Sequence, residues 1–314
     1  MKIVFMGTPE IAVPTLEACI EQHEVVAVFT QPDRPSGRGK KMTPPAVKVA
    51  AEKHGIPIYQ PEKIKNGDWV QKIEAMAPDV IVVLAFGQIL SKAILEIAKY
   101  GAINVHTSLL PKYRGAAPIN WAIVNGERES GVTTIQMDAG IDTGDMLLKD
   151  TVSIDKQMTA GELHDLLMMR GAALLIKTLE AVEAGTLKPE KQDEQLSSYA
   201  PMINRGMCDI KWSESAEAIV NRIRGFNPWP ICYTQHAETR VKIFTAEAVL
   251  LDPQEAPSST IGEIIEVESD YIKVACGEGA LKIYEIQYGN SKRMSVKSFL
   301  LGHAITCGEI LKEA

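Results

Sequence analysis

Two polar side chains stand two positions apart in an apolar stretch in the first half of the chain. Asn104 and His106 flank Val105. Residues two apart in a β-strand project from the same face, so the amide and the imidazole lie side by side. Pro111 and Gly115 follow and turn the chain, which places the pair at a strand end, where open α/β sheets bind ligands. The simplest alternative is a structural histidine capped by the neighbouring amide.

An amide beside an imidazole is suited to chemistry at a carbonyl group. Asn104 can donate an N–H to a developing oxyanion. His106 can donate to the same oxygen or carry a proton to a leaving group. A carboxylate beside the ring would fix its tautomer and stabilise its cationic form. The segment after the next predicted strand offers Asp138, Asp142 and Asp145, and spacing does not choose among them, because a loop can bring any of them to the ring.

Composition limits the classes of protein that fit. The 314 residues are enough for two domains, with a hydrophobic fraction of 46% and a charged fraction of 23% that are typical of soluble globular proteins. No apolar run reaches the ~18 residues of a membrane span, and the N-terminus lacks signal-peptide features, so we expect a cytoplasmic protein. The five scattered cysteines contain no CxxC pair, which argues against a disulfide framework or a zinc site. With a net charge of −7, nucleic-acid binding would need a local basic patch.

Strands that alternate with helices predict a mostly parallel α/β sheet in the first part of the chain. The expected strands are 2–6, 25–30, 56–59, 79–85, 103–105, 131–137 and 145–154, and the expected helices are 10–20, 45–54, 69–76, 118–125 and 159–184. The strand 79–85 has no polar alternation, which is typical of a central parallel strand. The turn at Gly7-Thr8-Pro9 is not GxGxxG, so we expect no dinucleotide cofactor.

The remainder of the chain has a different pattern. Residues 189–208 are polar, contain two prolines and lack periodicity, which predicts a linker between a domain at 1–188 and a second at 209–314. After the linker, one helix precedes short alternating strands, a pattern that favours a small OB-like β-barrel. The clusters there that could face phosphate are Arg222, Arg224, Lys292, Arg293 and Lys297. A solvated charged face explains them equally well.

The segment 31–45 is long for a connection between a strand and a helix. It holds four prolines, two glycines and four basic residues against one acidic residue, a composition that cannot pack a core. The closely spaced Arg34, Arg38, Lys40 and Lys41 suit a phosphate backbone. The plain alternative is a solvated, mobile loop.

Longer motifs around these residues resemble those of the 10-formyltetrahydrofolate-dependent formyltransferases. Asn-x-His continues into Ser-Leu-Leu-Pro-x-Tyr-Arg-Gly at 108–115, and Asp-Ala-Gly-Ile-Asp-Thr-Gly-Asp at 138–145 is similar to the family's second catalytic loop. Gly-Thr-Pro-Glu at 7–10 and Phe-Asn-Pro-Trp-Pro at 226–230 extend the match over nearly the whole chain. The resemblance implies a Rossmann-like formyltransferase domain with a mostly parallel sheet, followed by an OB-like barrel that helps to hold tRNA.

The resemblance also implies which residues act. The implied catalytic residues are Asn104, His106 and Asp142. The implied folate-binding residues are Phe86, Gly87, Gln88, Ile89, Leu90, Ser108, Leu109, Leu110, Pro111, Asp138, Gly140 and Ile141. The implied tRNA-binding residues are Gly7, Thr8, Pro9, Arg34, Arg38, Lys40, Lys41 and Arg114. Taken alone, the turn at 7–10 and the apolar turn at 86–90 also fit ordinary connections between a strand and a helix.

The implied reaction moves the formyl group of 10-formyltetrahydrofolate to the α-amino group of methionyl initiator tRNA, in a monomeric enzyme that needs no metal. The amine is itself the nucleophile, so no covalent step is needed. Ser108 beside His106 raises the alternative of a Ser–His nucleophile pair, but Gly-x-Ser-x-Gly is absent and no other triad order is apparent. Arg205 stands where the family commonly has a lysine. Because a guanidinium differs from an ammonium in shape and hydrogen bonding, the resemblance does not extend to a tRNA contact at this position.

Two other functions remain as alternatives. One is formyl transfer to a small amine, either glycinamide ribonucleotide or an amino sugar nucleotide, for which the basic segment 34–41 has no use. The other is an RNA-binding module with an inactive α/β domain, against which the intact set of Asn104, His106 and Asp142 speaks.

Overall fold

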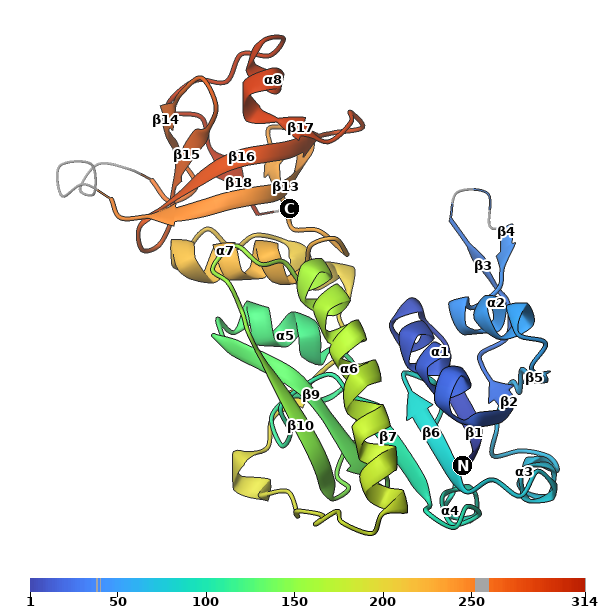
Figure 1. Ribbon diagram of the computed structural model, residues 1–314. Helices are drawn as coiled ribbons and strands as arrows, with labels where there is room; N and C mark the ends of the chain where they lie inside the picture. Colours follow the sequence, from blue (N-terminus) through green and yellow to red (C-terminus); the bar gives the residue numbers. More distant parts are fainter. Residues whose placement is uncertain (38, 40, 252–259, 314) are drawn as a thin grey trace. The chain divides into compact units, whose positions relative to one another are not determined.

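The computed structural model describes residues 1–37, 39, 41–251 and 260–313 (Figure 1). These residues form two compact units. The first comprises Met1–Pro118, Ser130–Val152 and His164–Ala200, and the second comprises Ile119–Glu129, Ser153–Leu163 and the chain from Pro201 onward. Arg38 and Lys40, two of the predicted tRNA-binding residues, lie outside the described residues.

The first unit is built on a seven-stranded sheet. In spatial order its strands are β10 (Met146–Ser153), β9 (Glu129–Gln136), β7 (Ala102–His106), β6 (Val80–Leu84), β1 (Lys2–Gly7), β2 (Glu24–Phe29) and β5 (Ile58–Tyr59). Each neighbouring pair from β7 to β5 is parallel, whereas β9 runs antiparallel to β7. The predicted mostly parallel sheet is confirmed, and β6 is buried over its whole length, as its continuous apolar run indicated.

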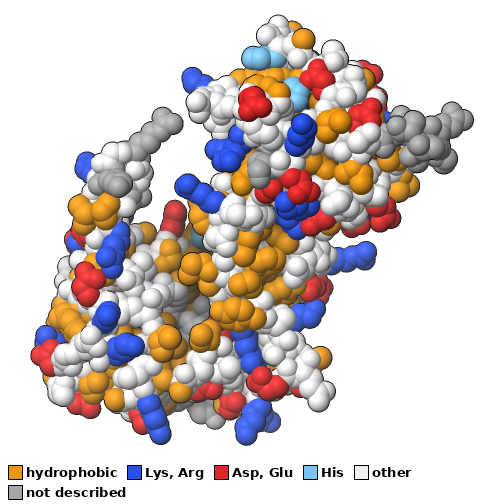
Figure 2. All heavy atoms as spheres, turned by 180° about the vertical axis from the view of Figure 1, so that it is seen from behind, with side chains coloured by type: hydrophobic (Ala, Val, Ile, Leu, Met, Phe, Trp, Pro, Cys, Tyr) orange, Lys and Arg blue, Asp and Glu red, His pale blue; other side chains and the backbone are white. Residues whose placement is uncertain are grey.

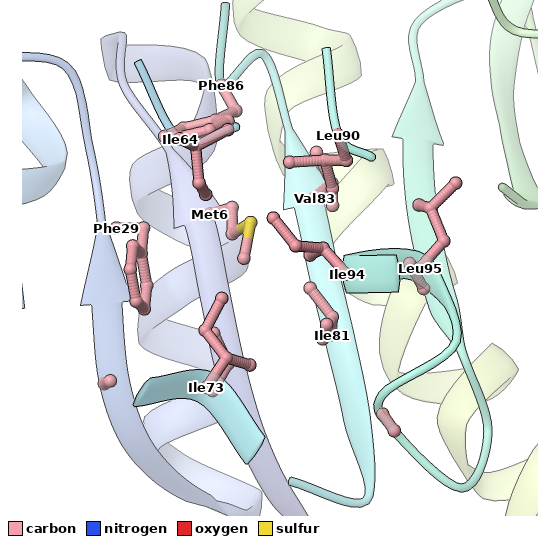
Figure 3. Packing of buried hydrophobic residues seen from close by; sticks show 14 residues of the cluster. Met6, Phe29, Ile64, Ile73, Ile81, Val83, Phe86, Leu90, Ile94 and Leu95 are labelled. Atoms are coloured by element: carbon pink, nitrogen blue, oxygen red, sulfur yellow. The ribbon is translucent and has the colours of Figure 1, made fainter. Parts of the chain in front are cut away.

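Helices cover both faces of this sheet (Figure 1). One face carries α1 (Val13–Gln22), α2 (Ala46–Lys53) and most of α6 (Ala160–Glu183), and the other carries α3 (Trp69–Ala75) and α4 (Lys92–Leu95). On the α3 and α4 side, alternate strand residues such as Met6, Phe29 and Ile81 pack with Ile73 and Ile94 of the helices (Figure 3). The strand alternation therefore supplies one apolar surface to each helical layer.

The segment 31–45 contains a short hairpin, where composition predicted only a loop. Its strands β3 (Arg34–Ser36) and β4 (Lys41–Thr43) pair antiparallel. Gly37 and Gly39 have φ angles of +68° and +94°, which glycine adopts without steric cost, so they allow the tight reversal. The prolines and glycines predicted the turn, but they did not indicate the backbone pairing on either side of it.

The second unit contains a curled antiparallel sheet. Its strands follow the order β14 (Ile264–Val267), β15 (Ile272–Ala275), β16 (Ala280–Tyr288), β13 (Thr239–Val249), β12 (Tyr233–His236) and β18 (Leu311–Lys312), and β17 (Met294–Ser295) pairs with β16. The two edges of the sheet meet: the backbone N–H of Ile264 donates to the Glu309 carbonyl at 2.8 Å, and that of Leu311 donates to the Gly262 carbonyl at 2.8 Å. The predicted OB-like barrel is confirmed.

Among the described residues of this unit, α7 (Ala216–Gly225) and α8 (Val296–Leu300) pack on the sheet, and α5 (Pro118–Val124) belongs to the unit from Ile119 onward. Ser215 caps α7, because its hydroxyl accepts a hydrogen bond from the Ala218 N–H. None of the described helices is both long and apolar enough to cross a membrane.

The predicted linker 189–208 is divided between the two units, since residues up to Ala200 are grouped with the first. There β11 (Tyr199–Ala200) pairs in parallel with β8 (Arg114–Gly115). Two short 3-10 turns, Glu194–Leu196 and Arg205–Cys208, complete the segment.

Candidate active site

Strand β7 carries Asn104 and His106 into the interior of the first unit. It lies between β6 and β9, and the two side chains are only 8% and 6% exposed. Val105 points to the opposite face, where a Cβ on Gly171 of α6 would lie 3.2 Å from its side chain. A buried amide and a buried imidazole need hydrogen-bond partners within the protein, and those partners define the site.

The imidazole of His106 is held from both ring nitrogens. Its Nε2 lies 2.8 Å from the Tyr113 carbonyl oxygen, and because a carbonyl only accepts, Nε2 must donate. Its Nδ1 lies 3.5 Å from Oδ2 of Asp142. In the neutral ring Nδ1 therefore carries no hydrogen, and its lone pair faces a carboxylate. Addition of one proton to Nδ1 would turn this contact into a charge-assisted hydrogen bond.

Asp142 is the carboxylate that meets the histidine. Its Oδ1 accepts a hydrogen bond from Nδ2 of Asn104 at 3.3 Å, and its Oδ2 accepts one from the backbone N–H of Gly115 at 2.9 Å. Its side chain is 16% exposed, so this one carboxylate touches both residues that the Asn-x-His spacing singled out.

The two neighbouring aspartates have other roles in the loop. Asp138 is exposed, and its Oδ1 accepts hydrogen bonds from the Gly140 N–H at 3.0 Å and the Thr143 hydroxyl at 2.6 Å. Asp145 uses its backbone carbonyl to accept from the Gln136 N–H at 2.9 Å. Asp138 thus shapes the loop that presents Asp142.

Ser108 does not form a nucleophile pair with the histidine. Its side chain is 1% exposed, and its hydroxyl donates to the Lys112 carbonyl at 2.7 Å. The hydroxyl hydrogen is therefore directed at a backbone carbonyl and not at either ring nitrogen of His106. The hydroxyl instead stabilises the turn that follows β7.

The residues predicted to bind folate divide into packed and exposed sets. Phe86 and Leu90 are in the core next to α3 and α4, and the Gln88 side chain is bonded to the backbone of residues 61 and 64. Ile89 and Ile141, in contrast, are 71% and 54% exposed. Two large apolar side chains on the loops that follow β6 and β9 offer a surface that an apolar ring could cover.

The other predicted folate contacts surround these side chains in the sequence. Gly87 is exposed with a φ of +81°, a conformation that suits a backbone approached by a ligand. Leu110 is buried, whereas Leu109 and Pro111 are partly exposed. Gly140 is exposed beside Ile141.

The turn at Gly7–Pro9 is tied to the loop that follows β6. The hydroxyl of Thr8 donates to the Phe86 carbonyl at 3.0 Å, and Nε2 of Gln31 donates to the same carbonyl at 3.1 Å. A Cβ on Gly7 would lie 2.8 Å from the Phe5 ring, so the close packing here requires glycine.

The described basic residues predicted to contact tRNA lie in contrasting environments. Arg34 is 63% exposed and meets Glu62 at 3.1 Å, and Lys41 is exposed; Figure 2 shows blue side chains on the hairpin. Arg114 is buried, and its guanidinium donates to Gln192 and Glu194.

Two candidate cations of the second unit are also engaged within the protein. Arg222 donates to Glu214 at 2.8 Å. Arg224 donates to the backbone carbonyls of Asp155 and Met158, and its burial lowers the pKa of its guanidinium. Sequence position gave no indication of either arrangement.

Sequence reasoning missed three groups that complete the site. These are the carbonyl of Tyr113, the N–H of Gly115 and the side chain of Gln192, whose amide donates to the carbonyls of Asp142 and Gly144 at 2.7 and 2.8 Å. A backbone N–H or carbonyl can belong to any residue type, so the sequence does not reveal which one will bond to the site. Gly115 alone carries a signal, because its φ of +110° and its contact with Tyr199 and Ala200 exclude a side chain.

A separate cavity of about 850 Å³ opens in the first unit. It is lined by parts of α4, α6 and the 185–189 segment, and by Asp138 and Ala139, but by none of the three clustered side chains. The three clustered side chains are of the types suited to chemistry at a carbonyl, so they form the candidate site. Within the part of the chain that the structure describes, no group of three or more His, Cys, Asp or Glu residues is arranged to hold a metal ion.

Comparison with known sequence families identifies the kind of protein. The profile described as "Formyl transferase" matches residues 1–179, and the one described as "Formyl transferase, C-terminal domain" matches residues 202–304. The chain belongs to the formyl transferase family. The clustered Asn104, His106 and Asp142 therefore lie in the formyl transferase part of the chain.

Curated formyl transferases resemble the chain over its full length. A protein named methionyl-tRNA formyltransferase from Clostridium beijerinckii is 50% identical over 313 residues, which cover 99% of this chain and 100% of that protein. The methionyl-tRNA formyltransferase of Clostridium acetobutylicum is 51% identical over 313 residues, with the same coverage.

Solved structures share the fold of this chain. The N-formyltransferase of Helicobacter canadensis, determined with folinic acid and dTDP-3-aminofucose, superposes with a TM-score of 0.67 at 24% identity, over 90% of this chain and 98% of that one. HypX from Aquifex aeolicus with tetrahydrofolic acid superposes with a TM-score of 0.62 at 17% identity, over 96% of this chain and 47% of that one. At these identities the likeness concerns the fold.

Proposed function

We propose that this formyl transferase moves a formyl group from 10-formyltetrahydrofolate to the α-amino group of methionyl initiator tRNA. The observation that carries the proposal is the buried cluster of Asn104, His106 and Asp142, in a chain about half identical to full-length methionyl-tRNA formyltransferases. The cluster accounts for acyl transfer, and the relatives indicate the acceptor.

Asn104 is the oxyanion donor in this proposal. One hydrogen of its amide is directed at Asp142, and the second is available to the oxygen of the formyl group. A buried donor that is already oriented needs no reorganisation as charge develops on that oxygen. Asp142 therefore aims Asn104 in addition to facing the imidazole.

His106 handles the proton. The folate co-substrate supplies the formyl carbonyl, whose carbon forms a bond to the amine nitrogen and loses its bond to the folate nitrogen. The bare Nδ1 of His106 accepts the proton that the amine loses, and Asp142 stabilises the imidazolium. The same proton then passes to the departing nitrogen, so that atoms and charge balance.

The exposed loops fit a folate ring. Ile89 and Ile141 offer apolar surface, while the exposed backbone of Gly87 and Gly140 offers polar groups. We assign to this site the predicted folate-binding residues Phe86, Gly87, Gln88, Ile89, Leu90, Ser108, Leu109, Leu110, Pro111, Asp138, Gly140 and Ile141. Phe86, Leu90 and Ser108 would act there by shaping the loops, because their side chains are buried.

The hairpin is the proposed tRNA contact of the first unit. Arg34 and Lys41 are exposed, Arg38 and Lys40 lie between them in the sequence, and phosphates attract such a group of cations. The turn of Gly7, Thr8 and Pro9 would lie at the reacting end of the tRNA. Such an enzyme would act in the cytoplasm, and we expect it to be a monomer.

Transfer of labelled formyl tests this function. The protein is mixed with labelled 10-formyltetrahydrofolate and, in separate reactions, methionyl initiator tRNA, glycinamide ribonucleotide and an amino sugar nucleotide. Label should appear on the aminoacyl-tRNA far faster than on either small amine. Preference for a small amine would overturn the assigned acceptor, and no transfer at all would favour an RNA-binding module.

A further inference from the structure

The segment 190–200, predicted from its composition to belong to a linker, is attached to the catalytic loops at several points. Glu190 and Met146 exchange two backbone hydrogen bonds of 2.8 Å each. The hydroxyl of Ser198 accepts from the Tyr113 N–H at 2.9 Å, next to the carbonyl that holds His106. The Ala200 carbonyl accepts from the Ala116 N–H at 2.9 Å. The segment thus contacts the start of β10 at Met146 and the residues around β8, which follow the two loops that carry the site.

Gln192 makes the most direct of these contacts. Its Nε2 donates to the backbone carbonyls of Asp142 at 2.7 Å and Gly144 at 2.8 Å. Its Oε1 accepts from Nε of Arg114 at 2.9 Å. Because the two carbonyls only accept and the guanidinium only donates, the orientation of the amide is fixed by its partners.

Asp142 needs such support because of its backbone. Its φ is +54°, in the left-handed region that is unfavourable for residues with a Cβ. The direction of its carboxylate follows from this conformation, and that direction brings Oδ2 to 3.5 Å from His106 Nδ1. Residues in such conformations persist where surrounding bonds over-determine them.

Arg114 bonds to the Gln192 side chain on the side away from the catalytic loop, and Glu194 in turn bonds to Arg114. The Nη1 and Nη2 atoms of Arg114 donate to the two carboxylate oxygens of Glu194 at 3.0 and 2.8 Å, and the Arg114 side chain is 10% exposed. A planar guanidinium bonded in this bidentate way has little freedom to rotate. Gln192 therefore has a fixed partner on one side and the catalytic loop on the other.

We propose that Gln192, oriented by Arg114, is a positioning residue for the reaction: it holds the Asp142 backbone so that the carboxylate faces Asn104 and His106. This inference rests on the proposed formyl transfer. It assigns Gln192 alone among the residues of this segment a role in catalysis, through Asp142, and it gives Arg114 a role inside the protein in place of the tRNA contact expected from the sequence.

Steady-state kinetics of three variants tests the inference. In Gln192→Ala both donated hydrogen bonds are lost, and kcat should fall about 10-fold to 100-fold. Gln192→Glu keeps the size and can still accept from Arg114, but it sets a carboxylate against two carbonyls, so it should lose at least as much. Gln195→Ala, an exposed glutamine of the same segment, is the matched control and should retain the parental kcat.

The KM values separate positioning from substrate binding. For Gln192→Ala, the KM for methionyl-tRNA and for 10-formyltetrahydrofolate should stay within about 3-fold of the parent's, because neither substrate is proposed to touch Gln192. Circular dichroism and the Tm establish that each variant is folded. A folded Gln192→Ala or Gln192→Glu protein with parental kcat would overturn the proposal.

A double-mutant cycle supplies the decisive readout. If Gln192 acts through Asp142, adding Gln192→Ala to Asp142→Ala should change kcat by less than about 2-fold. Losses that multiply would mean that Gln192 acts by another route. An inactive parental enzyme would instead count against the proposed function, so the two failures are distinguishable.

Discussion

The proposed catalytic cluster and the β3–β4 hairpin belong to the same unit, yet their polar side chains have very different hydrogen-bond partners. Asn104, His106 and Asp142 are bonded to one another or to backbone groups, away from water. Arg34 is 63% exposed, and it pairs with a glutamate that is 73% exposed. Exposed ion pairs contribute little to stability, so the hairpin can exchange its partners at little cost. The cluster should therefore govern turnover, and the hairpin should govern affinity for tRNA.

The largest effect should come from the cluster. His106→Ala removes the proton carrier and should lower kcat at least ~100-fold, with folding intact. Asn104→Ala and Asp142→Ala should fall in the same range, and the losses of combined variants should be far from additive, because the three act as a unit. Single-turnover formyl transfer measures the effect.

The control for this prediction is His164→Ala, since His164 is a partly exposed histidine of α6 that pairs with Asp165. It should keep the parental kcat. Near-normal turnover in His106→Ala would remove the imidazole from the mechanism and leave Asn104 and Asp142 to explain the site.

Two arginines allow a matched comparison of the buried and exposed environments. Arg114→Ala removes the buried guanidinium that orients Gln192 and should lower kcat about 10-fold, without altering the salt dependence of the KM for tRNA. Arg34→Ala should leave kcat unchanged and raise that KM by a few-fold. The opposite pattern, with Arg114 affecting only the KM, would restore Arg114 as a tRNA contact.

The hairpin can be tested as a whole. Replacing Arg34, Arg38, Lys40 and Lys41 by Ser should raise the KM for charged tRNA several-fold and flatten its salt dependence, which scales with about 0.9 per neutralised phosphate. Affinity for the folate should barely change. Binding of tritium-labelled tRNA at several salt concentrations measures the affinity for tRNA and the slope of its salt dependence. An unchanged slope would leave recognition to the second unit.

The smallest effect should appear in the pH dependence of stability. The hydrogen bond from Arg114 lowers the pKa of Glu194 from an ordinary value of about 4.3. Glu194 therefore stabilises the folded protein above about pH 5, and this contribution is lost as the pH falls through the depressed pKa. The Tm of the parent should exceed that of Glu194→Gln at pH 7, and the difference should shrink in acid. A constant difference would mean that the Glu194 charge is not involved.

Much of the first unit could be predicted from local sequence. The uninterrupted apolar run of β6 identified a central strand, and the Asn-x-His spacing placed Asn104 and His106 on one face, because strand alternation depends on nothing distant in the chain. The choice of Asp142 among three aspartates is different. It depends on the Gly115 N–H and on Gln192, which lie 27 and 50 positions away.

The limits of the two domains were harder to predict from the sequence than the strands, for a related reason. Composition at 189–208 is polar and aperiodic, which indicated a linker between 1–188 and 209–314, and those limits stay a prediction. The bonds that attach residues 190–200 to the first unit are made by backbone groups and by single polar side chains such as Gln192. Such contacts leave no hydrophobic periodicity, so sequence patterns do not register them.

The meeting of β14 and β18 in the second unit has a consequence for the behaviour of the protein at high concentration. A sheet edge with free N–H and C=O groups is a template on which another chain can add a strand. Here the backbone of Glu309 and Leu311 occupies the groups of Gly262 and Ile264. Residues 309–311 therefore act as a seal against edge-to-edge aggregation, and their loss would expose two strand edges at once.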